Sequence, residues 1–167
     1  LPVIGLNTAV LSISSQNFGA KNYNRIRELY LKALKFGCSF MIIAGFVIYF
    51  NASSLIGLFT NDSNTIYYGS IYLKIAALIG PIYPTFFITT ALFQSVKKPI
   101  YSLYLGILRL TALPFICLWF VINIKNGSYE DIFYTLLFTN WFMGICVLIF
   151  IGSFFNKTFN EKMIFSK

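Results

Sequence analysis

The stretch from Phe36 to Asn61, FGCSFMIIAGFVIYFNASSLIGLFTN, contains no charged residue. The hydrocarbon core of a bilayer is about 30 Å thick, and a helix needs about 20 predominantly apolar residues to cross it. The run meets this requirement, and only the part from Asn51 onwards becomes more polar. The stretch therefore predicts a membrane-spanning helix, and the rest of the chain has to be considered with a bilayer in place.

The composition of the whole chain supports the same interpretation. Apolar residues make up 57% of the 167 residues and charged residues only 11%, against about 45–50% and about a quarter in soluble domains. So few charges could not cover a soluble surface of this size. The net charge of +8 would suggest nucleic acid in a soluble chain. Here the basic residues fall between apolar runs, so we expect a lipid bilayer as partner and no nucleic acid.

Five apolar runs predict an all-α integral membrane protein with about five transmembrane helices. The expected spans cover about residues 1–17, 36–58, 70–96, 99–123 and 132–156, and together they form one partial transmembrane lobe over residues 1–167. Residues 22–35 alternate basic and apolar side chains at helical spacing, which is typical of an amphipathic segment at the lipid headgroups. Because Leu1 already lies inside an apolar run, we expect the chain to be a fragment of a longer protein.

The basic residues alternate between the two sides of the predicted bundle. The first and third connections and the tail hold most of them: Lys21, Arg25, Arg27, Lys32, Lys35, Lys97, Lys98, Lys157, Lys162 and Lys167. The second connection has none, and the fourth has only Lys125. Lys and Arg are enriched on the cytoplasmic side of membrane proteins. We therefore expect a multi-pass protein of the plasma membrane, the inner membrane in bacteria, with a cytoplasmic C-terminus.

The residue types needed for catalysis are scarce. The chain has no histidine, and Cys38, Cys117 and Cys146 are widely separated. The carboxylates fall near the predicted aqueous faces rather than in pairs within a span. General acid–base chemistry and metal binding both need such clusters. We therefore expect no enzyme, no metal site and no cofactor.

Three residues predict a discontinuity in the third span. Gly80, Pro81 and Pro84 lie within five positions, and proline removes a backbone donor and clashes with the preceding turn. A kink or break is therefore expected. Broken helices often line transporter cavities, although a bent helix that only packs against its neighbours would show the same pattern.

An aromatic and polar face follows this break. Tyr83, Phe87, Thr90 and Gln94 recur at helical spacing and are the candidates for a substrate cavity. Arg109 is a further candidate, because it is the only charge well inside a span, roughly 15 Å deep. Burying a charge there costs about 3 kcal/mol or more, so it is expected to be paired or functional. Since no span contains an acidic residue, we expect its partner to be a backbone carbonyl or a group outside this chain.

Three motifs resemble those of the multidrug and toxic compound extrusion (MATE) transporters. SSQNFGAKNYNRIRELYLKAL, from Ser14 to Leu34, resembles the Gln-x-x-Gly-Ala…Arg signature of that family. The stretch Leu55 to Ile75 resembles its Leu-Phe-Thr-Asn/Asp element, and Ala91 to Pro114 its turn into the eleventh helix, with an Arg…Pro pattern. The signature residues would be Gln16, Gly19, Ala20 and Arg25. By local rules Gly19 would end the first helix, and Asn22 or Asn24 would cap the next.

The resemblance implies a two-lobe, twelve-helix transporter of which this chain forms helices eight to twelve. It implies a secondary active antiporter that exports drugs and organic cations, small amphipathic or cationic substrates, in exchange for H⁺ or Na⁺. Some branches of the family carry a coupling carboxylate on the tenth helix. The matching region, Ile79 to Phe87, has none, so the coupling site is expected in the missing N-terminal lobe, which would be a partner of this one.

Two alternatives to the drug antiporter remain at this stage. A flippase for lipid-linked oligosaccharides or polysaccharides would share the fold and would need cationic side chains in its cavity. A non-transporting membrane scaffold subunit would share only the spans, and it would leave Arg109 and the break at Gly80 without a reason.

Overall fold

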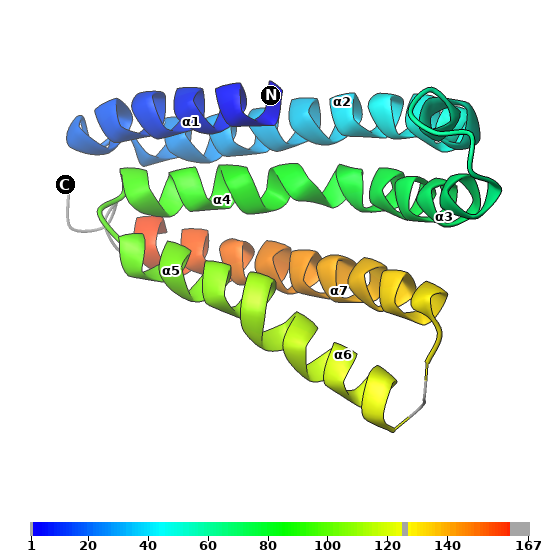
Figure 1. Ribbon diagram of the computed structural model, residues 1–167. Helices are drawn as coiled ribbons and strands as arrows, with labels where there is room; N and C mark the ends of the chain where they lie inside the picture. The colour runs from blue at the N-terminus through cyan, green and yellow to red at the C-terminus, as the bar shows by residue number, and fades with distance from the viewer. Residues whose placement is uncertain (1, 125–126, 161–167) are drawn as a thin grey trace.

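The computed structural model describes residues 2–124 and 127–160, and helices make up nearly all of this part of the chain. In order they are α1 (Pro2–Gly19), α2 (Tyr23–Gly57), α3 (Ser63–Ile79), a 3₁₀ turn (Gly80–Ile82), α4 (Tyr83–Ser95), α5 (Pro99–Ile107), a π-helical segment (Leu108–Ala112), α6 (Leu113–Asn123), α7 (Tyr129–Phe155) and a second π-helical segment (Asn156–Asn160). Within the described residues they form five rods, because α3 continues into α4 and α5 into α6. The all-α fold class is confirmed (Figure 1).

The rod made of α3 and α4 lies in the middle of the bundle. Figure 1 shows α1 and α2 on one side of it and α5, α6 and α7 on the other. In the most apolar window of this rod 67% of the residues are buried, against 6% for the rod of α5 and α6. The third predicted span is therefore the interior helix of the lobe, and the fourth is the most exposed to its surroundings.

Four helices in the described residues are long and apolar enough to cross a membrane: Tyr23–Gly57, Ser63–Ser95, Pro99–Asn123 and Tyr129–Phe159. They include nearly all residues of the second to fifth predicted spans, although the first two begin earlier than predicted. The first predicted span forms α1, which is not among the four. Its sequence includes Asn7, Thr8, Ser12 and Gln16, which lower its hydropathy. It nevertheless packs along α2 and α4 as the fifth rod.

The amphipathic segment and the second span belong to one continuous helix. α2 runs for 35 residues from Tyr23 to Gly57, with Asn22 as its N-cap. The basic side chains of its first turns point outward, whereas Ile26 and Tyr30 are buried against the rest of the bundle. Residues 23–35 of the predicted amphipathic segment therefore form the start of α2 and continue directly into the second predicted span.

Two tight turns at the same end of the bundle have the same backbone geometry. Lys21 and Lys97 have left-handed conformations, with φ of 58° and 60°. After α1, Asn22 N–H donates to the Asn17 carbonyl (2.8 Å) and Lys21 N–H to the Phe18 carbonyl (3.1 Å). Lys98 and Lys97 make the equivalent pair of bonds after α4. This is the Schellman motif. α1 ends at Gly19, as expected, and Lys21 takes the left-handed position that follows the helix.

Glycine at either left-handed position is expected to stabilise the protein. A left-handed residue with a Cβ atom costs roughly 1–2 kcal/mol, which glycine avoids at some cost in unfolded-chain entropy. Lys21→Gly and Lys97→Gly should therefore each raise the free energy of unfolding by about 1 kcal/mol. Thermal unfolding of the full-length protein in detergent measures this. The control is Lys98→Gly, at a residue with φ of −123°, which should lower the unfolding temperature; equal shifts for all three variants would contradict the argument.

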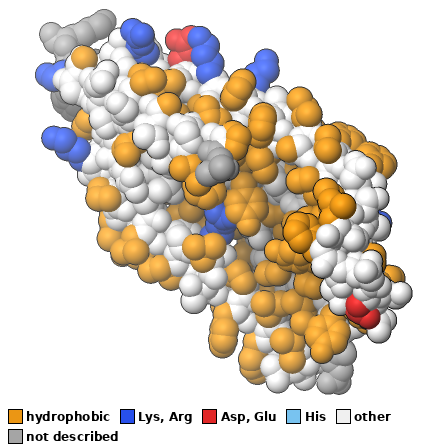
Figure 2. Space-filling model, turned by 45° about the horizontal axis from the view of Figure 1, so that its top comes forward, with side chains coloured by type: hydrophobic (Ala, Val, Ile, Leu, Met, Phe, Trp, Pro, Cys, Tyr) orange, Lys and Arg blue, Asp and Glu red, His pale blue; other side chains and the backbone are white. Residues whose placement is uncertain are grey.

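The charges are distributed as the sequence indicates. The α1–α2 turn, the α4–α5 turn and the end of α7 lie at the same end of the bundle (Figure 1). Figure 2 shows most of the Lys and Arg side chains on its face gathered at that end, while orange apolar side chains cover much of the remaining surface. The exposed apolar residues of the chain include Phe36, Phe46, Phe50 and Phe115. In a bilayer, lipid tails would cover these side chains.

The opposite end contains a helix cap formed by a titratable side chain, that of Asp62. Asp62 Oδ2 accepts hydrogen bonds from the Thr65 hydroxyl (2.6 Å) and the Thr65 backbone N–H (2.7 Å). These bonds favour the carboxylate and lower the pKa of Asp62 below its ordinary value. A carboxylate with a lowered pKa contributes stability above its unfolded pKa, and this contribution is lost as the pH falls through the folded pKa.

The cap therefore predicts a pH-dependent effect of substitution. Asp62→Ala should lower the unfolding temperature of the full-length protein at neutral pH. The difference from wild type should shrink as the pH falls below about 4, the ordinary range of an aspartate. Melting curves in detergent between neutral and acidic pH test this. Asp62→Asn, which keeps a capping oxygen that does not titrate, is the control; a wild-type-to-Ala difference independent of pH would contradict the assignment.

Glycines allow the rods to approach the break in α3–α4 closely. A Cβ atom on Gly45 of α2 would lie 2.8 Å from the Ala77 carbonyl oxygen, and one on Gly37 would lie 2.9 Å from Cβ of Pro84. On the other side, a Cβ atom on Gly144 of α7 would overlap the Ile82 side chain. Small residues permit such backbone approach between membrane helices. The break is therefore held between α2 and α7.

Candidate functional site

Two interruptions of helical geometry meet at the site. Gly80–Ile82 is a 3₁₀ turn between α3 and α4, and Pro84 lies in the first turn of α4. In the neighbouring rod, Leu113 N–H donates to the Leu108 carbonyl, five residues back. Pro114 cannot donate to Leu110, its usual helical acceptor, which favours this wider winding. Such π-bulges are frequent at functional sites, and this one contains Arg109.

The side chain of Arg109 points from the π-helical segment across to α4 and α7. Its Nε donates to Asn140 Oδ1 (3.4 Å). Its guanidinium carbon lies 3.8 Å from the centre of the Phe86 ring and 4.5 Å from that of Tyr83. Cations are attracted to the faces of aromatic rings at such distances. Arg109 is partly buried, and these contacts offset part of the cost of placing it there.

The neighbours of Arg109 within the chain differ from the backbone carbonyl that the sequence suggested. They are a side-chain amide and two aromatic rings. The other expectation, a group outside the chain, stays a prediction. Among residues 2–124 and 127–160 Arg109 makes no ion pair. Asn140 was missed, although an amide in the middle of an apolar run was a usable signal. Phe86 was missed because nothing local distinguishes it from other buried aromatics.

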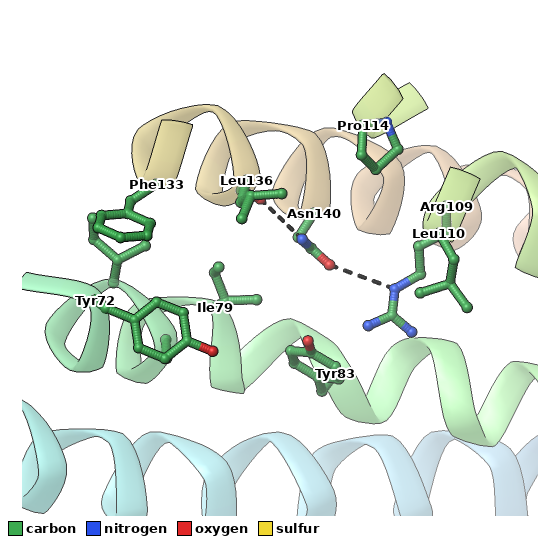
Figure 3. Close-up of a pocket in the computed structure, with 11 residues that line it drawn as sticks. Tyr72, Ile79, Tyr83, Arg109, Leu110, Pro114, Phe133, Leu136 and Asn140 are labelled. Atoms are coloured by element: carbon green, nitrogen blue, oxygen red, sulfur yellow. Dashed lines mark hydrogen bonds between the residues drawn. The ribbon is translucent and has the colours of Figure 1, made fainter. Parts of the chain in front are cut away.

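A pocket of about 250 Å³ opens beside Arg109. It lies between α3, α4, the π-helical segment, α6 and α7, and is lined by Tyr72, Ile75, Ala76, Ile79, Tyr83, Arg109, Leu110, Pro114, Phe133, Leu136 and Asn140. Figure 3 shows Arg109 toward one end of the pocket and Tyr72 and Phe133 toward the other, with Tyr83 and Asn140 facing the space between them. The rings of Tyr72 and Phe133 are 5.5 Å apart.

The other cavity candidates lie further along α4 and do not line this pocket. Phe87 stacks on Tyr83 with ring centres 6.4 Å apart, and its carbonyl accepts a hydrogen bond from Asn7 Nδ2 of α1 (2.6 Å). The carbonyl of Thr90 accepts one from Ser102 of α5 (3.1 Å). Gln94 is exposed near the end of α4. Of the four predicted residues of α4, only Tyr83 therefore lines the pocket.

The signature residues occupy a different place. Gln16, Gly19, Ala20 and Arg25 are exposed around the α1–α2 turn, and none lines the pocket. The Gln16 carbonyl accepts Ala20 N–H (3.0 Å), and the side chain of Asn22 caps Arg25 N–H (3.4 Å). In the described residues no group of His, Cys, Asp or Glu is arranged to hold a metal ion.

The sequence matches the model of the MatE family over residues 1–120, which includes the break and Arg109. The chain belongs to the MatE family. A curated relative, a protein named FAD transporter from Shewanella oneidensis, is 29% identical over 150 residues, which cover 86% of this chain and 31% of that protein. The expected family is thereby confirmed.

Two solved structures show the same fold. One is a MOP superfamily transporter from Pyrococcus furiosus, described as having a binding pocket of reverse polarity, with a TM-score of 0.86 at 18% identity over 93% of this chain and 35% of that one. The other is a multidrug resistance MATE family transporter in an outward-facing conformation, with a TM-score of 0.83 at 20% identity over 94% and 36%. This MatE chain spans about a third of the length of these relatives.

Proposed function

We propose that the chain forms most of the C-terminal lobe of a secondary active antiporter that exports amphipathic, drug-like compounds in exchange for H⁺ or Na⁺. The pocket at Arg109 carries this proposal. It lies where both the 3₁₀ turn and the π-helical segment interrupt spanning rods. Irregular backbone at membrane depth is tolerated where it is buried in protein or lines a cavity, and transporters place substrate sites at such discontinuous helices.

The proposal also covers the orientation of the chain in the membrane, the second lobe and the cofactor. The basic end of the bundle would face the cytoplasm, in the inner membrane if the cell is bacterial. A second lobe, with the site of the coupling ion, would close the cavity opposite α4. We propose no cofactor, because the H⁺ or Na⁺ gradient would supply the free energy for export.

The test is energised efflux by the complete transporter, expressed in cells that lack their main efflux pumps. A panel of cationic, neutral and anionic fluorescent compounds is loaded, and their loss from the cells is followed. We expect faster loss of at least one compound than in cells with an empty vector. A protonophore should abolish it if H⁺ drives transport, and removal of Na⁺ if Na⁺ does. Loss at the empty-vector rate for every compound would refute the proposal.

Flavin nucleotides are the second candidate cargo. The observation that favours them is the curated relative named FAD transporter, which matches 86% of this chain. FAD would be measured in the medium and in the cells of the same strains. Export above the empty-vector level that stops when the ion gradient is collapsed would favour this cargo; unchanged FAD in the medium would exclude it.

A further inference from the structure

The guanidinium of Arg109 has more hydrogen-bond donors than the described residues of this chain satisfy. A guanidinium carries five N–H donors and no acceptor. Its polar neighbours among the described residues are Asn140, which accepts from Nε, and the Tyr83 side chain. Figure 3 shows the two terminal nitrogens directed away from Asn140, toward α4. The fork of the guanidinium therefore retains donors for a further acceptor.

The described residues also supply no counter-charge to Arg109 within the pocket. None of its lining residues is acidic, and Arg109 is the only charged one. A guanidinium keeps its positive charge in proteins, and its field is strong where water is excluded. The two rings beneath it attract the charge without neutralising it. An organic cation placed here would be repelled, whereas an oxyanion would supply both the missing charge and the missing acceptors.

The shape of the pocket suits a flat molecule with an anionic end. Its volume of about 250 Å³ is somewhat below the range of pockets that enclose whole drug-sized ligands, about 300–1,000 Å³. Aromatic rings face the space at the end opposite Arg109, from Tyr72 and Phe133. A carboxylate, sulfonate or phosphate at Arg109 would thus place an attached ring system among these side chains.

We propose that Arg109 is a cargo-binding residue that receives the oxyanion of an aromatic, amphipathic cargo, so that this lobe selects anions over organic cations. The assignment rests on the proposed transport function, and it replaces the cationic cargo expected from the family resemblance. Asn140 is a positioning residue: its amide accepts from Nε and thereby fixes the orientation of the guanidinium at the end of the pocket, with the fork toward α4 beside Tyr83. Bidentate pairing of Arg with an oxyanion adds geometric specificity to the charge attraction.

A matched pair of probes tests the charge preference. Indole-3-acetate and tryptamine share the indole ring and carry opposite charges. Binding of each tritiated probe to the purified complete transporter is measured by scintillation proximity in detergent. Wild type should bind indole-3-acetate at least roughly tenfold more tightly than tryptamine, and Arg109→Gln should remove that preference. Arg109→Lys, which keeps the charge and loses the fork, should bind the anion with intermediate affinity.

Two further variants separate the site from general effects. Asn140→Asp leaves Arg109 in place but gives it a permanent counter-ion, and should reduce indole-3-acetate binding as strongly as Arg109→Gln does. Lys74→Gln removes a positive charge from α3 outside the pocket, where Lys74 lies over Tyr49, and should leave both affinities unchanged. Each variant must elute as a single species and unfold at a temperature near that of wild type.

The outcomes distinguish the inference from the function on which it rests. Unchanged indole-3-acetate binding in a folded Arg109→Gln or Asn140→Asp variant overturns the anion site, as does tighter binding of tryptamine by wild type. If cationic compounds are exported in an energised manner while indole-3-acetate is not bound, the transport function stands and the anion site falls. If nothing in the efflux panel is exported but binding depends on Arg109, the site stands and the proposed function falls.

Discussion

Gly144→Leu is expected to lower the free energy of unfolding by about 3 kcal/mol, a larger effect than any other single substitution proposed here. A side chain at this position of α7 would occupy the space of Ile82, which is only 5% exposed. Overpacking of this kind forces side chains out of their rotamers and moves the backbone. The indole N–H of Trp141, one turn earlier on α7, donates to the Leu78 carbonyl (3.0 Å). This contact restrains α7 from moving away from the break.

The control for this prediction lies on the same helix. Gly152 of α7 has nothing within 4 Å of the position that a Cβ atom would take, so Gly152→Ala should leave the protein equally stable or slightly more stable. Ile82→Ala should partly rescue Gly144→Leu, because it removes the clashing atoms. Thermal unfolding of the complete transporter in detergent is measured for wild type, Gly144→Leu, Gly152→Ala and the double variant Ile82→Ala/Gly144→Leu. Equal stability of Gly144→Leu and Gly152→Ala would show that the close approach is absent.

Thr89→Val is expected to destabilise the protein by about 2 kcal/mol. The Tyr30 hydroxyl of α2 and the Thr89 hydroxyl of α4 lie 2.8 Å apart in the core, with the two residues 1% and 0% exposed. Valine has nearly the shape of threonine but no hydroxyl, so the Tyr30 hydroxyl would remain buried without this partner. Leaving a buried polar group unsatisfied costs about 1–3 kcal/mol, more than the bond itself contributes.

A double variant that removes both hydroxyls tests this prediction most directly. Tyr30→Phe combined with Thr89→Val removes both hydroxyls and leaves an apolar contact of the same shape, which can be nearly neutral. The double variant should therefore unfold at a higher temperature than Thr89→Val alone. The unfolding temperatures of the two single variants and the double variant in detergent form the cycle. Additive losses would mean that the two hydroxyls act independently.

Gly144→Leu and Thr89→Val would both affect the position of the α3–α4 rod, which carries part of the candidate site. Gly144 sets the distance between α7, which bears Asn140, and the 3₁₀ turn that precedes Tyr83. Tyr30 holds α4 to α2 through Thr89, three residues after Phe86. A partial loss of function in either variant would thus follow from movement of the Arg109 environment, even though neither residue lines the pocket.

The amino-acid sequence by itself determined the features that depend on local composition. Apolar runs of spanning length indicated the helices, since the thickness of the bilayer sets their length. Gly80, Pro81 and Pro84 predicted a discontinuity where the structure has a 3₁₀ turn, because proline removes a donor whatever its surroundings. Arg109 was recognised as unusual because a charge inside a span is costly wherever the span is packed.

Only the tertiary structure decided which groups meet. Asn140 lies 31 positions after Arg109, and no spacing rule connects two residues on different rods. The close approach of Gly144 to Ile82 and the central position of α3 and α4 likewise depend on how separate rods pack together. The end of α1 at Gly19 was predicted from the sequence, but the left-handed residue of the turn is Lys21, which no local preference indicated. Local propensity is a property of a few neighbouring residues, whereas a binding pocket is a property of surfaces that only folding brings together.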